Sequence, residues 1–413
     1  MHVTTVNEHF YQPLHGMATQ SPHARPCFEL PDEDFIRMGV QRVLESSESG
    51  RGFIQEHGPR FEKIPSYTNY FAALRSGRRC DLVRDISLSL IRDCDTQLED
   101  RLASVPELST YECFAQDGHW HKAAVHDERH DNTKMAVGHF YSLNLRTHTL
   151  RHLTAGQGLH EHDMSALKRV TPKGLRQGVP KGKRVLIIYD KAAIDFGFWK
   201  RCRHECAIYF ISRVKENLVF DLVDRIEWDR SDPRNHGVTE DRRVLTREGH
   251  KMRIVCYTDP RSGESYEFLT NELDLPPGII VELYRRRWEA EKVFDQIKNK
   301  LSEKKAWASS LLAKEAQAQF ISITHNLLLR YEQSLESRHG IDNHAEDERR
   351  EKRLVEADES CSKAGKPLTT LVLRAQRATQ RSVKFIRWLR QSIRDNVTEA
   401  SATLRLKQLY ATS

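Results

Sequence analysis

The stretch LYRRRWEAEKVFDQIKNKL, from Leu283 to Leu301, decides how this chain is interpreted. It follows a Pro-Pro-Gly break at Pro276 to Gly278, contains no internal glycine or proline, and consists largely of good helix formers. We therefore expect a helix from Leu283 to Leu301.

Polar and apolar side chains separate on this expected helix. At 100° per residue, one stripe about 60° wide holds four polar residues: Tyr284, Arg287, Glu291 and Lys298. The neighbouring face is apolar and predicts packing on a core: Leu283, Phe294, Ile297 and Leu301. Glu291 thus lies at the edge of the core between cations, which suits an active-site carboxylate. The alternative is a charged surface helix with i, i+4 pairs.

The spacing Tyr284-x2-Arg287-x3-Glu291-x6-Lys298 resembles the YREK signature of the insertion-sequence 4 type DDE transposases. The wider segment TNELDLPPGIIVELYRRRWEAEKVFDQIKNKL, from Thr270 to Leu301, resembles that family throughout. The resemblance implies a ribonuclease H-like catalytic core that brings two aspartates to the glutamate.

Composition narrows the class of protein. The chain has 413 residues, enough for two or three domains, and no apolar run approaches the length of a membrane span. Its N-terminus has neither a basic start nor an apolar stretch, so we expect a cytoplasmic protein that does not bind membranes. The formal charge is only +7, but residues 363–413 carry eleven Lys or Arg against two acids.

Eight cysteines show no paired framework, which predicts free thiols in a reducing compartment. The group Cys202-Arg-His204-Glu-Cys206 could suggest a metal site. A second Cys or His pair at finger-like spacing is missing nearby, so we favour free thiols there.

Residues 1–105 are expected to form a helical N-terminal domain that binds DNA. Apolar residues recur at helical spacing in PDEDFIRMGVQRVLE and CDLVRDISLSLIRDCDTQLEDRL. Between them, the link SYTNYFAALRSGRR combines aromatic residues with Arg75, Arg78 and Arg79 and could grip DNA. The alternative is a packing domain with a solvated loop.

Residues 106–216 and 276–335 are expected to form the two parts of the ribonuclease H-like α/β core. TYECFAQ and RVLIIYD predict strands that finish at Asp117 and Asp190, with a hairpin and a short helix between them and a helix and a strand after them. Asp127 and Asp195 are rival carboxylates, but neither follows a β-rich run directly. Asp195 suits the start of a helix.

Two further regions complete the expected organisation. Residues 217–275 alternate apolar and polar positions and predict an all-β insertion that separates Asp190 from Glu291. Residues 336–413 are expected to be a charged linker followed by a basic helical region. In KFIRWLRQSIR, apolar residues can face a partner molecule while Lys384, Arg387, Arg390 and Arg394 face solvent or phosphate; protein dimer, DNA and membrane surface are the possible partners, and we favour the first two.

The histidine-rich loop after Asp117 invites a metal interpretation. DGHWHKAAVHDERH contains His119, His121, His126 and His130, but lacks strict ligand spacing. We favour a loop near DNA over a histidine metal site. His119 also departs from the Asp-Gly-Ser or Asp-Gly-Thr of many family members.

The chemistry of phosphodiester cleavage predicts that the site holds metal ions. Two divalent ions can neutralise the phosphate and activate water or a 3′-hydroxyl, and Mg²⁺ prefers oxygen ligands. We expect Asp117, Asp190 and Glu291 to be catalytic and to hold two Mg²⁺ ions, for which Mn²⁺ can substitute.

The remaining expectations concern DNA. The resemblance implies that Tyr284, Arg287 and Lys298 contact phosphates, and Trp288 could stack on a displaced base or simply flank the core. It also implies cleavage at inverted-repeat ends, a hairpin intermediate, joining to target DNA, and a homodimer that pairs two ends of double-stranded DNA, on the nucleoid of a bacterium. The alternatives are a ribonuclease H-like nuclease without strand transfer, and an inactive DNA-binding descendant, which would be expected to lack a carboxylate.

Overall fold

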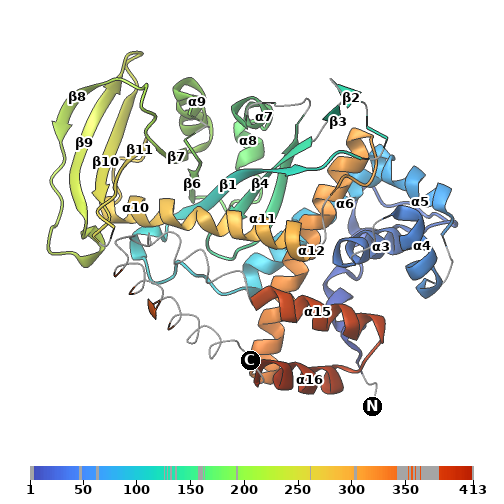
Figure 1. The fold of residues 1–413 in the computed structure, drawn as a ribbon. Coiled ribbons are helices and arrows are strands. Elements are labelled where there is room, and N and C mark those ends of the chain that lie inside the picture. The colour runs from blue at the N-terminus through green and yellow to red at the C-terminus, as the bar shows by residue number, and fades with distance from the viewer. Residues whose placement is uncertain are drawn as a thin grey trace.

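A computed structural model shows one large mixed sheet with helices on both faces and helical regions at both ends of the chain (Figure 1). It describes residues 4–45, 49–61, 65–124, 126–127, 129–130, 133–134, 137–156, 161, 163–191, 194–260, 262–301, 305–341 and 381–411, and positions 352, 355, 356, 359 and 363. Within these, the description excludes the side chains of 129, 130, 133, 134, 137, 163, 295, 298–300 and 381–383.

The N-terminal region is helical, as predicted. Its helices are α1 (Val6–Tyr11), α2 (Met17–Gln20), α3 (Asp32–Leu44), α4 (Gly50–His57), α5 (Tyr67–Leu74) and α6 (Gly77–Gln97). Thr5 and Glu8 form a capping box at the start of α1, and the Ser66 and Ser76 hydroxyls cap α5 and α6 by accepting backbone N–H bonds.

The segment expected to link two helices is itself mostly helix α5. Its arginines are partly engaged inside the protein: the Arg78 Nη1 to Asp32 Oδ2 distance is 2.7 Å, and the Arg79 Nε to Asp32 Oδ1 distance is 3.2 Å. Asp32 is 7% exposed, so these contacts fasten α6 to the start of α3. Arg78 and Arg79 therefore have a structural role that the sequence did not reveal.

Nine strands form the main sheet in the order β5-β4-β1-β6-β7-β11-β10-β9-β8. Only the β1–β6 and β6–β7 pairs are parallel. The strands are β1 (Tyr111–His121), β4 (Val137–Asn144), β5 (Leu150–Ala155), β6 (Arg184–Ile188), β7 (Ile208–Arg213), β8 (Phe220–Arg225), β9 (Val238–Thr246), β10 (Lys251–Thr258) and β11 (Ser265–Thr270). A separate small hairpin pairs β2 (Arg129–His130) with β3 (Thr133–Lys134).

Both faces of the central strands are buried, which explains the continuous apolar run RVLIIY. Leu186 and Ile188 of β6 belong to one hydrophobic core, and Val185 and Ile187 belong to the other. Helices α7 (Asp163–Arg169), α8 (Pro172–Leu175) and α9 (Phe196–Cys206) cover one face, and α10 (Pro277–Arg286), α11 (Trp288–Lys300) and α12 (Leu311–His339) cover the other (Figure 1).

Strand β1 was predicted to end at Asp117. This prediction is wrong, because the strand continues to His121. Its parallel pairing with β6 stops at Ala115 opposite Ile188, whereas its antiparallel pairing with β4 continues to His121 opposite Val137. The hairpin partner therefore sustains the strand beyond the carboxylate.

The four strands of residues 217–275 extend the same sheet. Strand β11 pairs with β7 through Phe268 opposite Arg213, and β10, β9 and β8 follow outward. The predicted strands are confirmed, and they continue the sheet of the core. The proposed domain boundaries stay predictions.

The helix expected from Leu283 begins earlier, because Pro277 and Gly278 form the first turn of α10. Proline is tolerated there, since the first N–H groups of a helix have no partner within it. Helix α11 follows directly, and Arg287 between the two helices keeps helical backbone angles. The predicted apolar face is confirmed: Leu283, Phe294, Ile297 and Leu301 are all buried.

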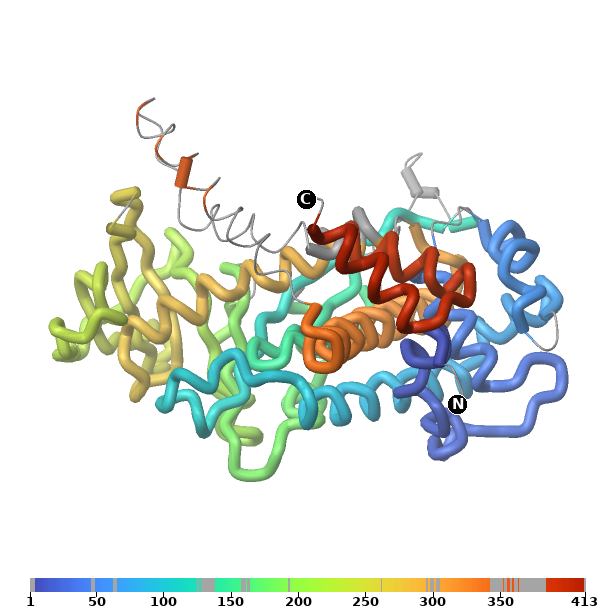
Figure 2. Tube along the Cα trace, turned by 90° about the horizontal axis from the view of Figure 1, so that it is seen from below, coloured from blue at the N-terminus to red at the C-terminus, as the bar shows by residue number. Residues whose placement is uncertain are grey.

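The C-terminal helices α15 (Arg381–Arg394) and α16 (Glu399–Ala411) lie beside α1 and the end of α12 (Figure 2). The apolar face of α15 is buried against the chain itself: Phe385, Ile386, Leu389 and Ile393 are each at most 6% exposed. That face is therefore covered by other parts of the same chain and is not exposed for a partner molecule. Residues 342–351, in the segment expected to be a linker, lie outside the described residues.

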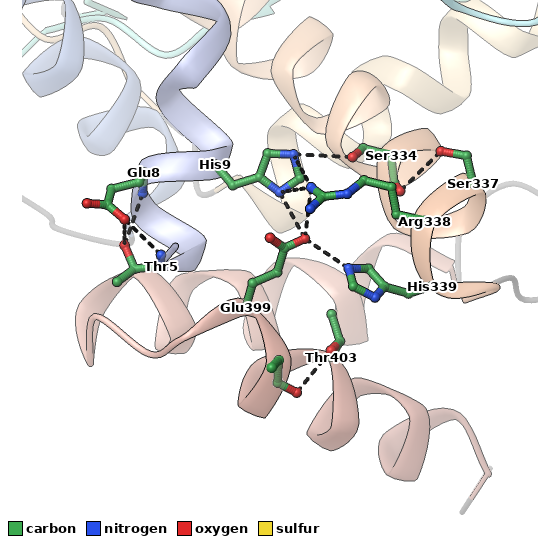
Figure 3. Close-up of polar contacts among 10 residues, drawn as sticks. Thr5, Glu8, His9, Ser334, Ser337, Arg338, His339, Glu399 and Thr403 are labelled. Atoms are coloured by element: carbon green, nitrogen blue, oxygen red, sulfur yellow. Dashed lines mark hydrogen bonds and ion pairs between the residues drawn. The ribbon is translucent and has the colours of Figure 1, made fainter. Parts of the chain in front are cut away.

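One carboxylate joins the two ends of the chain (Figure 3). Glu399 Oε1 lies 3.1 Å from His9 Nδ1, 2.9 Å from His339 Nε2 and 3.2 Å from Arg338 Nη1. Glu399 opens α16, His9 belongs to α1, and the other two residues end α12. We call these four residues the terminal clasp.

Among the helices that the structure describes, none has the length and apolar character needed to cross a membrane.

Candidate active site

Asp117 and Asp190 occupy equivalent positions on neighbouring parallel strands. The register of β1 and β6 ends with Ala115 opposite Ile188, and each aspartate lies two residues further on. Neighbouring strands are about 4.8 Å apart, so the two carboxylates start from adjacent backbone positions at one edge of the sheet. The structure thus brings together two residues that are far apart in the sequence.

Local hydrogen bonds orient both aspartates. Asp117 Oδ1 accepts from the Gly118 N–H at 2.8 Å, and Asp190 Oδ1 accepts from the Lys191 N–H at 2.7 Å. The Ser212 hydroxyl on β7 donates to the Asp190 carbonyl at 3.2 Å. Asp117 is 22% exposed, so its carboxylate remains accessible from solvent.

Glu291 approaches this edge from the first turn of α11, and Arg287 connects it to Asp117. Arg287 Nη1 lies 3.4 Å from Asp117 Oδ2, and Nη2 lies 2.8 Å from Glu291 Oε1. The Arg287 side chain is only 7% exposed. One buried guanidinium therefore bridges two of the three predicted catalytic carboxylates.

The pKa of Arg287 reports the negative charge around it. Burial alone would lower this pKa, but it is raised because four groups lie near: Tyr284, Glu291, Asp117 and Asp190. Asp190 thus belongs to the same electrostatic environment. All three predicted carboxylates surround one cation.

Aromatic residues line a cavity of about 80 Å³ beside Asp190. Its other lining residues come from β7, β10, β11, α10 and α11 or directly follow one of these elements: Arg213, Tyr257, Asp259, Tyr266, Phe268, Tyr284, Arg285, Arg287 and Trp288. Burial, with the negative charge of Asp190, raises the pKa of Tyr284 to about 12, although Arg213 and Arg287 oppose this. The Tyr284 hydroxyl therefore stays protonated and can donate a hydrogen bond at neutral pH.

Several cavity residues escaped the sequence interpretation. Asp259 is 4% exposed and lies 3.6 Å from Arg285, which also contacts the Tyr257 hydroxyl. Arg285 lies in the helix that was predicted from Leu283 to Leu301. Its two partners are Tyr257, near the end of β10, and Asp259, just after β10, and the sequence did not assign this strand to the site. Only the pairing of β11 with β7 brings them to Asp190.

Trp288 lines this cavity at the start of α11, with the Arg287 guanidinium carbon 5.9 Å from its ring centroid. Lys298 belongs to α11, but its side chain lies outside the described residues. The structure therefore leaves the expected phosphate contact of Lys298 untested.

The rival aspartates have other partners. Asp127 Oδ1 lies 2.9 Å from Lys314 Nζ, and Asp127 is also bound to the Ala124 N–H. Asp195 caps α9 by accepting from the Phe198 N–H at 2.7 Å, as expected for a carboxylate at a helix start.

Two of the four histidines after Asp117, His119 and His121, are packed inside the protein. His119 stacks on Phe294 of α11 with 5.4 Å between ring centroids, and His121 lies 4.7 Å from His139 by the same measure. His126 is exposed, and the side chain of His130 lies outside the described residues. Cys202 is buried in the core under α9.

No group of three or more His, Cys, Asp or Glu side chains in the described part of the chain is arranged to hold a metal ion. Around Asp117, Asp190 and Glu291, the positive charge is instead supplied by Arg287. All the donor atoms of these three residues are carboxylate oxygens, which is the ligand type that hard divalent ions prefer.

Comparison with curated proteins gave no match. The family model described as "Transposase DDE domain" matches residues 116–327, slightly more than half of the chain. The matched segment contains both aspartates, Glu291 and the strands and helices that position them. The chain therefore belongs to the transposase DDE domain family.

Proposed function

We propose that this protein is a transposase that cuts DNA at the inverted-repeat ends of an insertion sequence and joins those ends to target DNA. One observation supports this most: within the matched domain, the parallel register sets Asp117 beside Asp190, and Arg287 links Asp117 to Glu291. We assign these three carboxylates as the catalytic residues.

The carboxylate oxygens of the donor set are the ligand type that divalent metal ions prefer, although these described side chains are not arranged as a metal site in this structure. Asp117, Asp190 and Glu291 would hold two Mg²⁺ ions, or Mn²⁺ in their place, because a cluster of carboxylates around a buried guanidinium is a site that attracts cations. When bound, such ions neutralise phosphate charge and make water a stronger nucleophile at neutral pH. Arg287 would then exchange carboxylate oxygens for phosphate oxygens.

The polar residues of α10 and α11 would hold the DNA backbone. Arg287 offers a bidentate fork to a phosphate, the protonated Tyr284 hydroxyl can donate, and Lys298 would add a point charge. Trp288, at the mouth of the aromatic cavity, would stack on a displaced base. These roles rest on the resemblance to the YREK signature and on the positions of Arg287 and Tyr284 beside the carboxylates.

The order of reactions follows from the same resemblance. Water nicks one strand, the freed 3′-hydroxyl attacks the other strand to form a hairpin, and the reopened ends are joined to target DNA on the nucleoid. Two ends must react together, which favours a homodimer. We also propose the ribonuclease H-like core and the inserted β-region as the organisation behind this chemistry.

A ribonuclease H-like nuclease without strand transfer is the second candidate, since the same carboxylates would serve hydrolysis alone. An inactive DNA-binding descendant is disfavoured because all three acids are present. The two active candidates differ in their products: only a transposase forms hairpins and joined strands.

The decisive experiment incubates the full chain with Mg²⁺ and a DNA carrying the inverted repeats that flank its gene. Denaturing gels should show nicks, hairpins and joined products. Asp117→Asn, Asp190→Asn and Glu291→Gln should each reduce cleavage by at least about 1,000-fold while DNA binding persists, because each loses a charge that metal binding needs. Asp221→Asn, on edge strand β8, is the matched control and should cleave normally. Wild-type cleavage by any of the three site variants would remove that residue from the assignment, and nicks without joined products would favour the nuclease.

A further inference from the structure

Trp120 lies over the backbone of Gly138 and is partly exposed. It lies opposite Gly138 in the antiparallel β1–β4 pair. A Cβ at Gly138 would meet three indole atoms, Cζ2, Cε2 and Cη2, at 3.2 to 3.3 Å, so the ring lies over the bare glycine backbone. The residue nevertheless remains 41% exposed. Gly138 thus supports a large aromatic ring that is available to a ligand.

Two exposed lysines lie at the end of the strand that carries Trp120. Lys122 follows Trp120 by two residues on the same side of the strand, and it forms an isolated parallel bridge with Lys305. The bridge is held by the Ala306 N–H, which donates to the Lys122 carbonyl at 2.8 Å. Like charges at directly opposed positions repel, so this arrangement favours an anion between or beside them.

Two acids near this site, both within the described part of the chain, already pair with other cations. Asp127, in the loop that follows Lys122, pairs with Lys314 at 2.9 Å. Glu161, which lies close to Gly156 beside Gly138, pairs with Arg169. Among the described residues, neither Lys122 nor Lys305 takes part in an ion pair.

We propose that Trp120, Lys122 and Lys305 form a binding site for a DNA strand with an unpaired base, separate from the carboxylates and from the aromatic cavity beside Asp190. The indole stacks on the base, and the two ammonium groups bind the flanking phosphates. The inference rests on the proposed function, because it takes DNA as the substrate.

The position along β1 separates the platform from the carboxylates. Trp120 is three residues beyond Asp117, or about 10 Å along the strand, and its side chain projects from the opposite face of the strand. That distance corresponds to roughly three nucleotides at 3.4 Å each. Beyond Ala115, β1 is no longer paired with β6, and at Lys122 the Lys305–Ala306 segment lies along that side of the strand instead. A DNA strand that runs from the carboxylates to Trp120 would therefore pass around the end of β1.

The test measures equilibrium binding of the full chain to two DNAs: a blunt duplex, and the same duplex with a short single-stranded dT tail. The wild type should prefer the tailed DNA. Trp120→Ala should weaken tailed binding by about 5- to 150-fold, the range for loss of one base–aromatic stack, and leave blunt binding unchanged. Trp120→Phe should retain most of the preference. Gly138→Val, which displaces the indole, should reduce it.

The lysines give a separate readout. Lys122→Ala and Lys305→Ala should each lower the salt slope for tailed DNA by about 0.7 to 0.9, the value for one phosphate contact. Lys181→Ala is the matched control, because this exposed lysine precedes β6, whereas Asp190 follows it. The two residues therefore lie at opposite ends of the same strand. Quenching of tryptophan fluorescence by the dT tail should be smaller in Trp120→Phe than in the wild type.

The outcomes separate the two proposals. A wild type that binds neither DNA overturns DNA as substrate, and the platform with it. A wild type that binds both, with an unchanged tail preference and unchanged quenching in the Trp120 variants, overturns the platform alone. A change of oligomeric state in Trp120→Ala without loss of tail preference would make this surface a protein contact and would also overturn it.

Discussion

The charge balance of the candidate active site depends on one residue, Arg287. Three carboxylates close together repel one another, and a buried guanidinium offsets that repulsion. Arg287 reaches Asp117 and Glu291 from the junction of α10 and α11, so the helix that carries the glutamate also carries its counter-ion. The same cation that stabilises the folded site should compete with any divalent ion for the carboxylate oxygens.

We therefore predict that Arg287→Gln binds Mn²⁺ about ten-fold more tightly than the wild type, because one positive charge leaves the cluster. Isothermal titration calorimetry with MnCl₂ measures this. Asp190→Asn and Glu291→Gln should change the affinity in the opposite direction. Arg242→Gln, which alters a surface arginine on β9 paired with Glu240 and Glu267, is the control. Weaker Mn²⁺ binding by Arg287→Gln would show that the arginine does not compete with metal.

At the level of residues, the sequence predicted the acids but not their surroundings. Asp117 and Asp190 could be selected because each follows a run of β-forming residues. The aromatic cavity could not be predicted, because Tyr257, Tyr266 and Phe268 reach Asp190 only through strand pairing. Alternation of apolar and polar residues indicates that a segment is a strand, but it does not show which other strand pairs with it.

Among the elements, α10 is anchored by buried polar contacts from the outer strands. Arg253 forms a two-point ion pair with Asp241, with distances of 2.9 and 2.6 Å, and donates to the Leu275 carbonyl at 2.6 Å. Asn235 Oδ1 accepts from the Gly278 N–H at 2.9 Å, where a Cβ would meet the Arg234 carbonyl oxygen at 2.0 Å. These contacts fix where the helix that leads to Arg287 begins.

Helix α11 is positioned in a similar way. His148 Nε2 lies 2.5 Å from Glu289 Oε2, and the His325 ring bonds to the His148 carbonyl at 3.0 Å. His148 adopts a left-handed backbone conformation with φ of 60°, which is costly for a residue with a Cβ. The turn between β4 and β5 thus holds the helix two residues from Glu291.

Arg253→Met should destabilise the protein by about 3 to 5 kcal/mol, because it leaves Asp241 fully buried without its cation. Urea unfolding measures the loss. The double variant Arg253→Met/Asp241→Leu should recover much of it, since no charge then remains buried. Arg243→Met removes a half-exposed pair with Asp224 and should cost no more than about 1 kcal/mol. If the double variant were as unstable as the single one, packing rather than the ion pair would explain the effect.

Element types were predictable where one local signal dominated. The helical spacing of 31–45 and the strand-forming run RVLIIY led to α3 and β6. The start of α10 was missed, because Pro-Pro-Gly ends one element or begins another with equal ease. The outer strands were recognised as strands, but their membership in the core sheet depends on long-range pairing.

Across the whole molecule, buried neutral histidines link stability to pH. His152 accepts from the Gln319 amide at Nδ1 and can donate from Nε2 to His139 Nδ1 at 3.3 Å. Burial lowers the pKa of His152 to about 3 and that of His325 to about 4. Because an unfolded histidine titrates near 6.5, the unfolded chain binds these protons first as the pH falls.

Stability should therefore be full above about pH 6.5 and should fall as the pH drops toward 4 and then 3. At about pH 5, each of these two histidines should reduce the free energy of unfolding by about 2 kcal/mol. Urea midpoints at about pH 7.5 and pH 5 test this. His325→Gln should shrink the difference between the two midpoints, whereas His204→Gln, at an exposed position of α9, should not. A pH difference that survives His325→Gln unchanged would contradict its assignment.

The terminal clasp makes the last helices part of the core. Burial would raise the pKa of Glu399, but it is lowered because His339, His9 and Arg338 stabilise the carboxylate. The clasp should thus hold at neutral pH and weaken as the pH falls through the lowered pKa of Glu399. Since α15 also packs against α11, release of the clasp would loosen one side of the helix that carries Glu291.

Glu399→Ala should detach α15 and α16 locally while the sheet remains folded. Loss of one part-buried carboxylate with three charged or polar partners should cost about 2 to 3 kcal/mol. Hydrogen exchange in residues 381–411 should accelerate by roughly 10- to 100-fold, with no change in β6. Arg405→Ala, on the exposed side of α16, removes a charge from the same helix and should leave exchange unchanged. Equal acceleration in β6 would mean that the clasp stabilises the whole fold, whereas selective acceleration in α15 and α16 would establish the C-terminal pair as a separately opening unit beside α11.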